Sequence, residues 1–227
     1  KVLQDKIGIT NTVTDKKINA LTAALRGDYA DNWAGSGFNS YSVAATVGDL
    51  NIQTPTARAI DALTARSDGH YNKLMINGSR LQRVTDSFSL YAGLSGQLAS
   101  KNLDNSEKMQ LGGIQAVRAY LEDEAYADEG YVMTLEARQN LPKFTDNMLG
   151  QLQLVGFVDT GHVKIDQTPW TTGDNSRTLS GAGVGLNWMD YNNFVMKLAY
   201  AHKLGSEKAT SAPDSNGQFW VQLVKYF

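Results

Sequence analysis

Apolar and polar residues alternate along most of this chain, often over stretches of ten residues. The clearest stretch is 194–203, in which one face carries Phe194, Met196, Leu198 and Tyr200 and the other carries Lys197, Ala199, Ala201 and Lys203. Neighbouring side chains of a β-strand point to opposite faces, so a period of two residues is typical of a strand. The pattern predicts strands with one apolar and one polar face.

The same alternation recurs about ten times along the chain. It predicts strands near 1–11, 16–28, 37–53, 70–84, 87–100, 131–142, 148–164, 176–190, 193–205 and 217–227. Most of these are longer than the roughly 5–6 residues of a usual globular strand, and they suit a tilted crossing of a bilayer. The segment 54–66 is the one helix-prone stretch, and we expect a short helix there.

The connections between the predicted strands are of two kinds. From residue 54 onward, long polar connections at 54–69, 101–130, 165–176 and 206–216 alternate with short ones at 84–87, 142–147 and 190–192. Membrane barrels have short periplasmic turns and long extracellular loops. We therefore predict an all-β fold, an antiparallel transmembrane β-barrel that is present here as an incomplete set of about ten strands. A soluble β-sandwich with uneven loops is the alternative left open by the pattern.

Composition is compatible with this fold. The mean hydropathy is −0.33, and 42% of the residues are hydrophobic, as in soluble domains, but alternating strands give a membrane barrel the same average. The balanced charge, 21 Lys and Arg against 23 Asp and Glu, argues against a nucleic-acid partner. The chain has no cysteine, which suits an oxidising compartment. It also has no apolar run long enough for a spanning helix.

The last predicted strand carries aromatic and apolar residues on one face. These are Phe219, Val221, Leu223 and the final residue, Phe227, while Lys225 interrupts the face. A C-terminal aromatic residue on such a strand resembles the signal that outer-membrane assembly machinery recognises. The tryptophans suit an aromatic girdle, although core packing explains any one of them equally well. They are Trp33, Trp170, Trp188 and Trp220.

Residues suited to catalysis are scattered. His70, His162 and His202 lie in different segments, without the spacing of metal ligands. The glycines at 181, 183 and 185 lie within a predicted strand that no helix follows, so they do not form a phosphate loop. We expect neither an enzyme nor a metal or cofactor site.

The most specific motifs lie in the connection 101–130 and in the strands after it. They comprise Gly112-Gly113, Val117-Arg118-Ala119-Tyr120, Leu135-Glu136-Ala137-Arg138 and Phe157-Val158-Asp159-Thr160-Gly161. Together these motifs resemble the two-partner secretion transporters, a family that includes FhaC, ShlB and HecB and is related to the barrel-assembly protein BamA. The resemblance spans nearly the whole chain.

The resemblance implies that the connection folds back into the barrel lumen. Arg118 would then meet Asp159 and Glu136 on the inner wall. Alternation independently places both acids on the polar face of their strands. A guanidinium has five donors in a planar fork and can bridge two carboxylates. The ordinary alternative is a solvated loop arginine and an unpaired lumen acid.

Ala119 stands where the family usually has glycine. If this position requires a positive φ, alanine strains the turn by about 1 kcal/mol. We expect the glycines at 181, 183 and 185 to leave room for the connection on the inner wall.

The resemblance also implies a function and a location. We expect an outer-membrane pore of a Gram-negative bacterium that exports a large secreted protein of the haemolysin, haemagglutinin or adhesin type without ATP. A BamA-like insertase and a general porin are the alternatives. Expected partners are this secreted protein and outer-membrane lipid.

The family has about sixteen strands, an N-terminal plug helix and POTRA domains, with five strands after the conserved loop. Five strands are also predicted here after residue 130. Residues 1–227 are therefore expected to be the C-terminal portion of the barrel, without POTRA domains, plug helix and early strands. The segment from Lys1 to Asp5 already alternates like a strand and is unlike a signal peptide.

Overall fold

Ten antiparallel strands form one large sheet in the computed structural model, which describes residues 1–7, 12–122, 124–190 and 192–226. Within the described residues, each strand of this sheet pairs with the next strand of the same sheet along the sequence, so the order is β1-β2-β3-β4-β5-β8-β9-β10-β11-β12. The strands are β1 (Val2–Ile7), β2 (Thr12–Asp31), β3 (Ser36–Ile52), β4 (Gly69–Arg83), β5 (Phe88–Ala99), β8 (Glu129–Asn140), β9 (Gln151–Lys164), β10 (Ser176–Asp190), β11 (Phe194–Lys203) and β12 (Gly217–Lys225).

This arrangement confirms the predicted all-β fold and its ten strands. The described strands lie in this sheet and in one two-stranded sheet, rather than in two packed sheets, so the sandwich alternative is wrong. The parts of the first and last predicted strands at 8–11 and at Phe227 lie outside the described residues. The expected short helix is present as α1 (Pro55–Leu63). No helix among the described residues combines the length and apolar character needed to cross a membrane.

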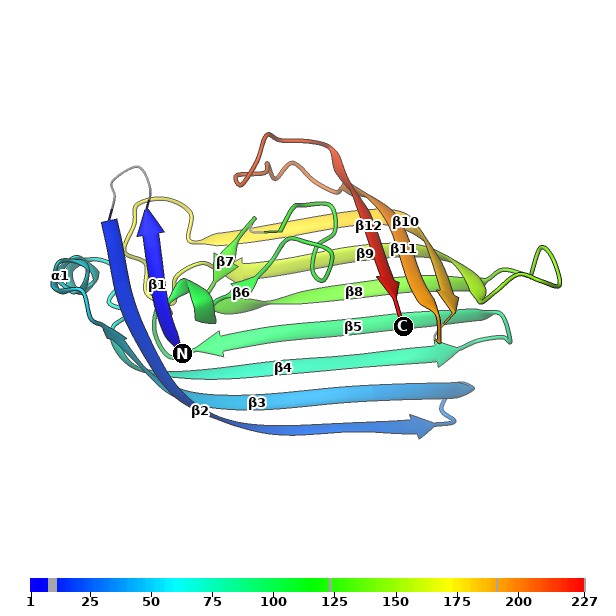
Figure 1. Ribbon diagram of the computed structural model, residues 1–227, viewed down its shortest axis with the longest axis horizontal. Helices are drawn as coiled ribbons and strands as arrows, with labels where there is room; N and C mark the ends of the chain where they lie inside the picture. Colours follow the sequence, from blue (N-terminus) through cyan, green and yellow to red (C-terminus); the bar gives the residue numbers. More distant parts are fainter. Residues whose placement is uncertain (8–11, 123, 191, 227) are drawn as a thin grey trace.

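The sheet is strongly curved, and its two edges turn toward the same side (Figure 1). The long connections 53–68, 100–128, 165–175 and 204–216 gather at one end of the strands, and shorter links lie at the other end. The link between β8 and β9 covers 141–150, and is longer than the turn predicted at 142–147. The concave face is the side toward which the connection 100–128 folds.

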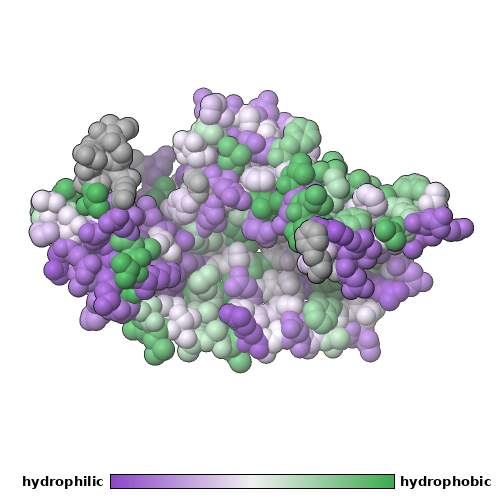
Figure 2. All heavy atoms as spheres, in the orientation of Figure 1, coloured by the Kyte–Doolittle hydropathy of each residue, from purple (hydrophilic) through white to green (hydrophobic). Residues whose placement is uncertain are grey.

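The two faces of the sheet differ in chemistry. Apolar side chains such as Leu21, Leu25 and Val47 are exposed on the convex face. On the concave face, the hydroxyls of Thr22 and Thr46 share a hydrogen bond of 2.8 Å between β2 and β3. Figure 2 shows pale and purple residues in the hollow, and both purple and green residues around it. This division between the faces agrees with the predicted alternation.

We name residues 100–128 the inner loop, because this segment lies against the concave face. It contains a short 3-10 helix, η1 (Asn105–Glu107), and a two-stranded sheet of β6 (Met109–Gln110) and β7 (Tyr126–Ala127). These small elements were not predicted. Figure 1 shows β6 and β7 in front of the large sheet rather than beyond its end.

The inner loop is also bound to its neighbours at the long-loop end. The Asn102 side-chain amide donates to the carbonyl oxygens of Ala65 and Thr168, each at 2.8 Å, and accepts from the Thr168 backbone amide at 2.7 Å. Asp128, which is fully buried, accepts from the backbone amides of Leu103 and Gln167. Three long connections are therefore joined by side chains of one of them.

Candidate functional site

Backbone hydrogen bonds hold the inner loop in a tight hairpin. The Leu111 amide donates to the Ala125 carbonyl, and the Gly113 amide donates to the Tyr120 carbonyl, each at 3.0 Å. Gly113 has a φ of +113°, which favours glycine at this position. A Cβ on Gly112 would lie 2.3 Å from the Leu121 carbonyl oxygen, so this position also requires glycine. Both glycines singled out in the sequence therefore shape the hairpin.

Apolar side chains fix the hairpin against the wall of the sheet. Leu111, Val117 and Tyr120 are fully buried and belong to one cluster with Phe157 of β9 and Leu179 of β10. Burying an apolar side chain of this size contributes roughly 1.5–3 kcal/mol. A Cβ on Gly161 would lie 2.5 Å from Leu111 Cδ1, so the last glycine of the motif in β9 makes room for the loop.

The Arg118 side chain lies over β9 and binds Asp159 through two side-chain hydrogen bonds. Nε donates to Oδ2 and Nη2 donates to Oδ1, each at 2.8 Å. The Arg118 backbone amide also donates to Oδ2, at 3.2 Å. Thr134 of β8 donates its hydroxyl to Oδ1. Asp159 is fully buried, so these donors replace the water that its carboxylate would otherwise bind.

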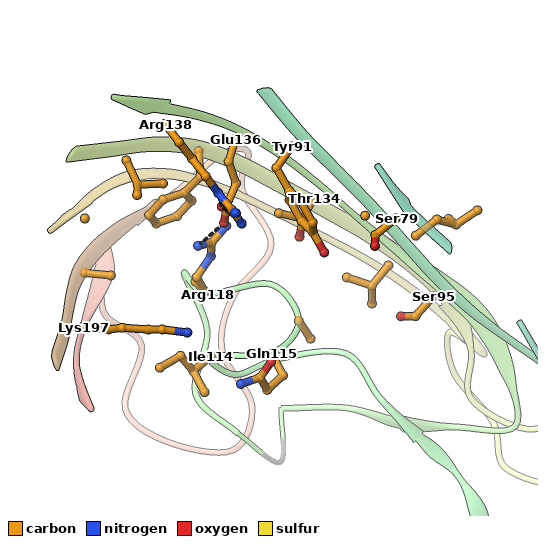
Figure 3. Close-up of a pocket in the computed structure, with 18 of the residues that line it drawn as sticks. Ser79, Tyr91, Ser95, Ile114, Gln115, Arg118, Thr134, Glu136, Arg138 and Lys197 are labelled. Atoms are coloured by element: carbon orange, nitrogen blue, oxygen red, sulfur yellow. Dashed lines mark hydrogen bonds and ion pairs between the residues drawn. The ribbon is translucent and has the colours of Figure 1, made fainter. Parts of the chain in front are cut away.

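Glu136 of β8 joins two arginines. Its Oε1 lies 2.8 Å from Nη1 of Arg118, and its Oε2 lies 2.7 Å from Nη2 of Arg138. Figure 3 shows the Arg118 side chain extending from the loop toward Glu136 and Arg138 on the wall. Arg118 also lies over the Phe157 ring, with Cζ 3.5 Å from the ring centroid. Two guanidiniums and two carboxylates thus balance in charge at the wall.

Ala119 packs closely against the wall of the sheet, and its backbone does not have the strain of a positive φ. Positive φ among the described non-glycine residues occurs only at Ala34 and Arg66, so Ala119 does not require glycine for its backbone. Its side chain is fully buried against Gly181 of β10. A Cβ on Gly181 would lie 2.4 Å from the Ala119 Cβ. Glycine on the wall therefore accommodates alanine on the loop.

Trp220 of β12 also binds the tip of the loop, and the sequence motifs do not reveal this contact. Its indole Nε1 donates to the Arg118 carbonyl oxygen at 2.7 Å. Trp220 alternates with Phe219 and Val221, which are exposed on the convex face, so it lies on the concave face and not in an aromatic girdle. The parity of the last strand was the signal that could have identified it.

Polar and apolar residues together line a cavity of about 530 Å³ between the hairpin tip and the concave face. Its lining includes Arg118 and Glu136 together with small hydroxyl-bearing residues of the wall. The hydroxyl-bearing residues are Ser40, Ser42, Ser79, Ser95 and Thr134. Figure 3 shows Lys197 of β11 on the other side of Arg118, near Ile114 and Gln115. The concave face therefore offers hydrogen-bonding groups in the space beside the tip.

Comparison with known proteins shows which family has this architecture. Residues 32–188, most of the chain, match the model of the haemolysin secretion/activation protein ShlB/FhaC/HecB family. The chain belongs to this family, as its motifs indicated. Family membership and the alternating antiparallel strands identify it as part of an outer-membrane β-barrel of a Gram-negative bacterium.

Individual relatives agree with this assignment. The chain is 27% identical over 225 residues to the heme/hemopexin transporter protein HuxB of Haemophilus influenzae, covering 99% of this chain and 39% of the relative. It is 28% identical over 137 residues to the outer membrane transporter CdiB of Dickeya dadantii, covering 60% of this chain and 23% of the relative. The chain thus spans less than half the length of these relatives.

A solved structure, CdiB from Escherichia coli, shares the fold with a TM-score of 0.57 and 15% identity. The match covers 97% of this chain and 48% of that structure.

Proposed function

We propose that this chain forms part of the pore of an outer-membrane transporter that exports a large secreted partner protein by two-partner secretion. Support comes from the family, whose description names secretion and activation of haemolysin. Two relatives, HuxB and CdiB, also carry the word transporter in their names. Residues 1–227 would be the C-terminal part of a larger barrel, in which further strands join β1 to β12.

The observation that carries the proposal is the position of Arg118. Its bonds to Asp159 and Glu136 hold the inner loop against the wall of the proposed pore. The loop would keep the barrel in a state able to conduct an unfolded chain, while the hydroxyl-lined cavity beside it exchanges hydrogen bonds with that chain through water. This role needs no catalytic group, and we propose that the protein is not an enzyme.

Arg118→Ala in the full-length protein tests this role. We expect export of the partner to be abolished or sharply reduced while the barrel still reaches the outer membrane. Arg83→Ala is the matched control, because Arg83 forms an exposed pair with Asp86 in a turn. Both variants are compared by the amount of partner in the medium and by the heat-modifiable mobility of the folded barrel. Normal secretion by Arg118→Ala would overturn the assigned role.

Exchange of the two charges tests the pairing itself. Arg118→Asp and Asp159→Arg each place like charges together, and we expect each to reduce export. Combined, they restore opposite charges at the same place, so we expect partial recovery. A double variant no better than the single ones would count against the pair.

A further inference from the structure

A second carboxylate of the inner loop is almost completely enclosed, although it does not belong to the Arg118 site. Glu124 is only 3% exposed. Its Oε1 accepts from Arg177 Nη1 at 2.7 Å, from the Thr210 amide at 2.6 Å and from the Thr210 hydroxyl at 3.0 Å. Its Oε2 accepts from the amide and hydroxyl of Ser211, at 3.2 and 2.6 Å. Four of these five donors come from the connection between β11 and β12.

We name this connection, residues 204–216, the outer loop. Arg177 lies at the start of β10 and also binds the outer loop. It donates to the Glu207 carboxylate at 3.0 Å and to the Lys208 carbonyl at 2.8 Å. Figure 1 shows the outer loop, in orange and red, reaching back from β11 and β12 over the region of the inner loop.

The outer loop also contacts the hairpin next to Arg118. The Tyr120 hydroxyl donates to the Glu207 carbonyl oxygen at 2.9 Å. The ammonium of Lys203 lies 4.5 Å from the centroid of the Tyr120 ring, and Lys203 is paired with Asp214 of the outer loop. Two residues that follow Arg118 in the inner loop, Tyr120 and Glu124, therefore both hold the outer loop.

These contacts link the positions of the two loops. If the outer loop lifts, Glu124 keeps Arg177 but loses its four donors from Thr210 and Ser211 and must take water in their place. If the inner loop moves, the outer loop loses the acceptor that orders Thr210 and Ser211. Either loop is therefore most stable when the other is in place.

We propose that Glu124 is the latch by which the inner loop holds the outer loop over the mouth of the pore, and that passage of the exported protein requires its release. This inference rests on the proposed transport function. Glu124 acts in it as a positioning residue, since its effect on the mouth passes through the outer loop.

Trypsin cleavage after Lys208, which is exposed, measures release of the outer loop on cells that carry the full-length protein. Glu124→Gln removes the charge that orders Thr210 and Ser211, and we expect cleavage about tenfold faster, because proteolysis follows the population of the open form. Glu122→Gln, at an exposed position of the same loop, is the control and should leave the rate unchanged. Equal rates for the two variants would refute the latch.

A milder variant keeps the test valid if Glu124→Gln does not assemble. Ser211→Ala removes one donor from the exposed outer loop, and we expect cleavage after Lys208 to be about threefold faster. Ser206→Ala, elsewhere in the same loop, is its control. An unchanged rate for Ser211→Ala would also contradict the latch.

A reversible cross-link tests whether release accompanies transport. Glu124→Cys with Thr210→Cys replaces the hydrogen bonds by a disulfide. Under oxidising conditions we expect export to fall at least about tenfold, and a reductant should restore it to the level of the reduced double variant. Equal export by the oxidised and reduced forms would overturn the requirement for release. The two proposals can fail separately, because Arg118→Ala leaves Glu124 in place. Normal secretion by Arg118→Ala would refute the role of Arg118 in transport. Faster cleavage in Glu124→Gln would still support the contact between the two loops.

Discussion

Both oxygens of the Asp159 carboxylate accept hydrogen bonds from Arg118, and Oδ2 accepts from its backbone amide as well as from its side chain. Asp159 therefore orients the backbone of the loop tip in addition to balancing a charge. Glu136 contacts the same guanidinium through Nη1 and shares its second oxygen with Arg138. The two acids differ in what they hold, and this difference leads to the first prediction.

Asp159→Asn should destabilise the protein more than Glu136→Gln. The amide at 159 would leave Arg118 without its main partner, and breaking a buried ion pair costs about 3–5 kcal/mol. Glu136→Gln leaves Asp159 in place as the partner of Arg118 and should cost less, about 1.5–3 kcal/mol, as for a hydrogen bond to a charged group. Urea unfolding in detergent micelles, followed by tryptophan fluorescence, measures both. Equal losses, or a larger loss for Glu136→Gln, would contradict this ranking.

Gly181→Ala should displace the hairpin from the wall, because the added methyl group would lie 2.4 Å from the Ala119 Cβ. We expect a loss of about 1–3 kcal/mol, as for other overpacked sites. Ala119→Gly in the same protein should restore most of the stability by moving the methyl group from the loop to the wall. Gly156→Ala in β9 is the control, since its Cβ would meet no atom within 4 Å. The same unfolding assay applies, and a double variant as unstable as Gly181→Ala would disprove the contact.

Trp220→Phe should weaken the attachment of the loop tip to β12. The variant removes the donor that the Arg118 carbonyl receives and should cost about 1 kcal/mol. Trp170→Phe, in the connection 165–175, is the matched control. Hydrogen exchange of the inner loop checks the prediction: we expect faster exchange at 114–120 in Trp220→Phe alone. Unchanged exchange there would show that this bond contributes nothing.

The attachment of the outer loop should persist in moderate acid. Burial alone raises the pKa of Glu124, but hydrogen bonds from Ser211, Arg177 and Thr210 outweigh it and lower the pKa to about 2. A carboxyl whose pKa is lower in the folded protein than in the unfolded chain stabilises the folded protein. This contribution is complete above the pKa of the unfolded chain, near 4.5, and is lost as the pH falls to the folded-state pKa of about 2. Glu207 shares Arg177 with Glu124, and Asp214 of the outer loop pairs with Lys203.

Pepsin, which is active in acid, can follow this titration through cleavage near the exposed Leu204. With rates normalised to a free peptide, we expect slow cleavage at pH 4 and faster cleavage as the pH approaches 2. Glu124→Gln should already be cleaved rapidly at pH 4. A wild-type rate that rises fully between pH 5 and 4 would show that the carboxyl titrates near its ordinary value.

Much of the fold was predictable because a strand with lipid on one side and water on the other must alternate. The parity that placed Glu136 and Asp159 on one face follows from this requirement, and the motif around Arg118 added the loop. The contacts of Glu124 with Thr210 and Ser211 were not predictable, because they join segments 86 or 87 residues apart in the sequence. The parity of the last strand could place Trp220 on the concave face, but it could not identify the Arg118 carbonyl as its partner. The strain considered for Ala119 depended on a positive φ, and the hairpin does not adopt that backbone angle at this position.

The bonds of Asn102 to Ala65 and Thr168 constrain how the exposed end of the barrel can diversify. Surface segments that face antibodies and phages usually vary independently of one another. Here a deletion in 165–175 would also deprive 100–104 of a binding partner, so tolerated variants should arise as matched changes in two segments.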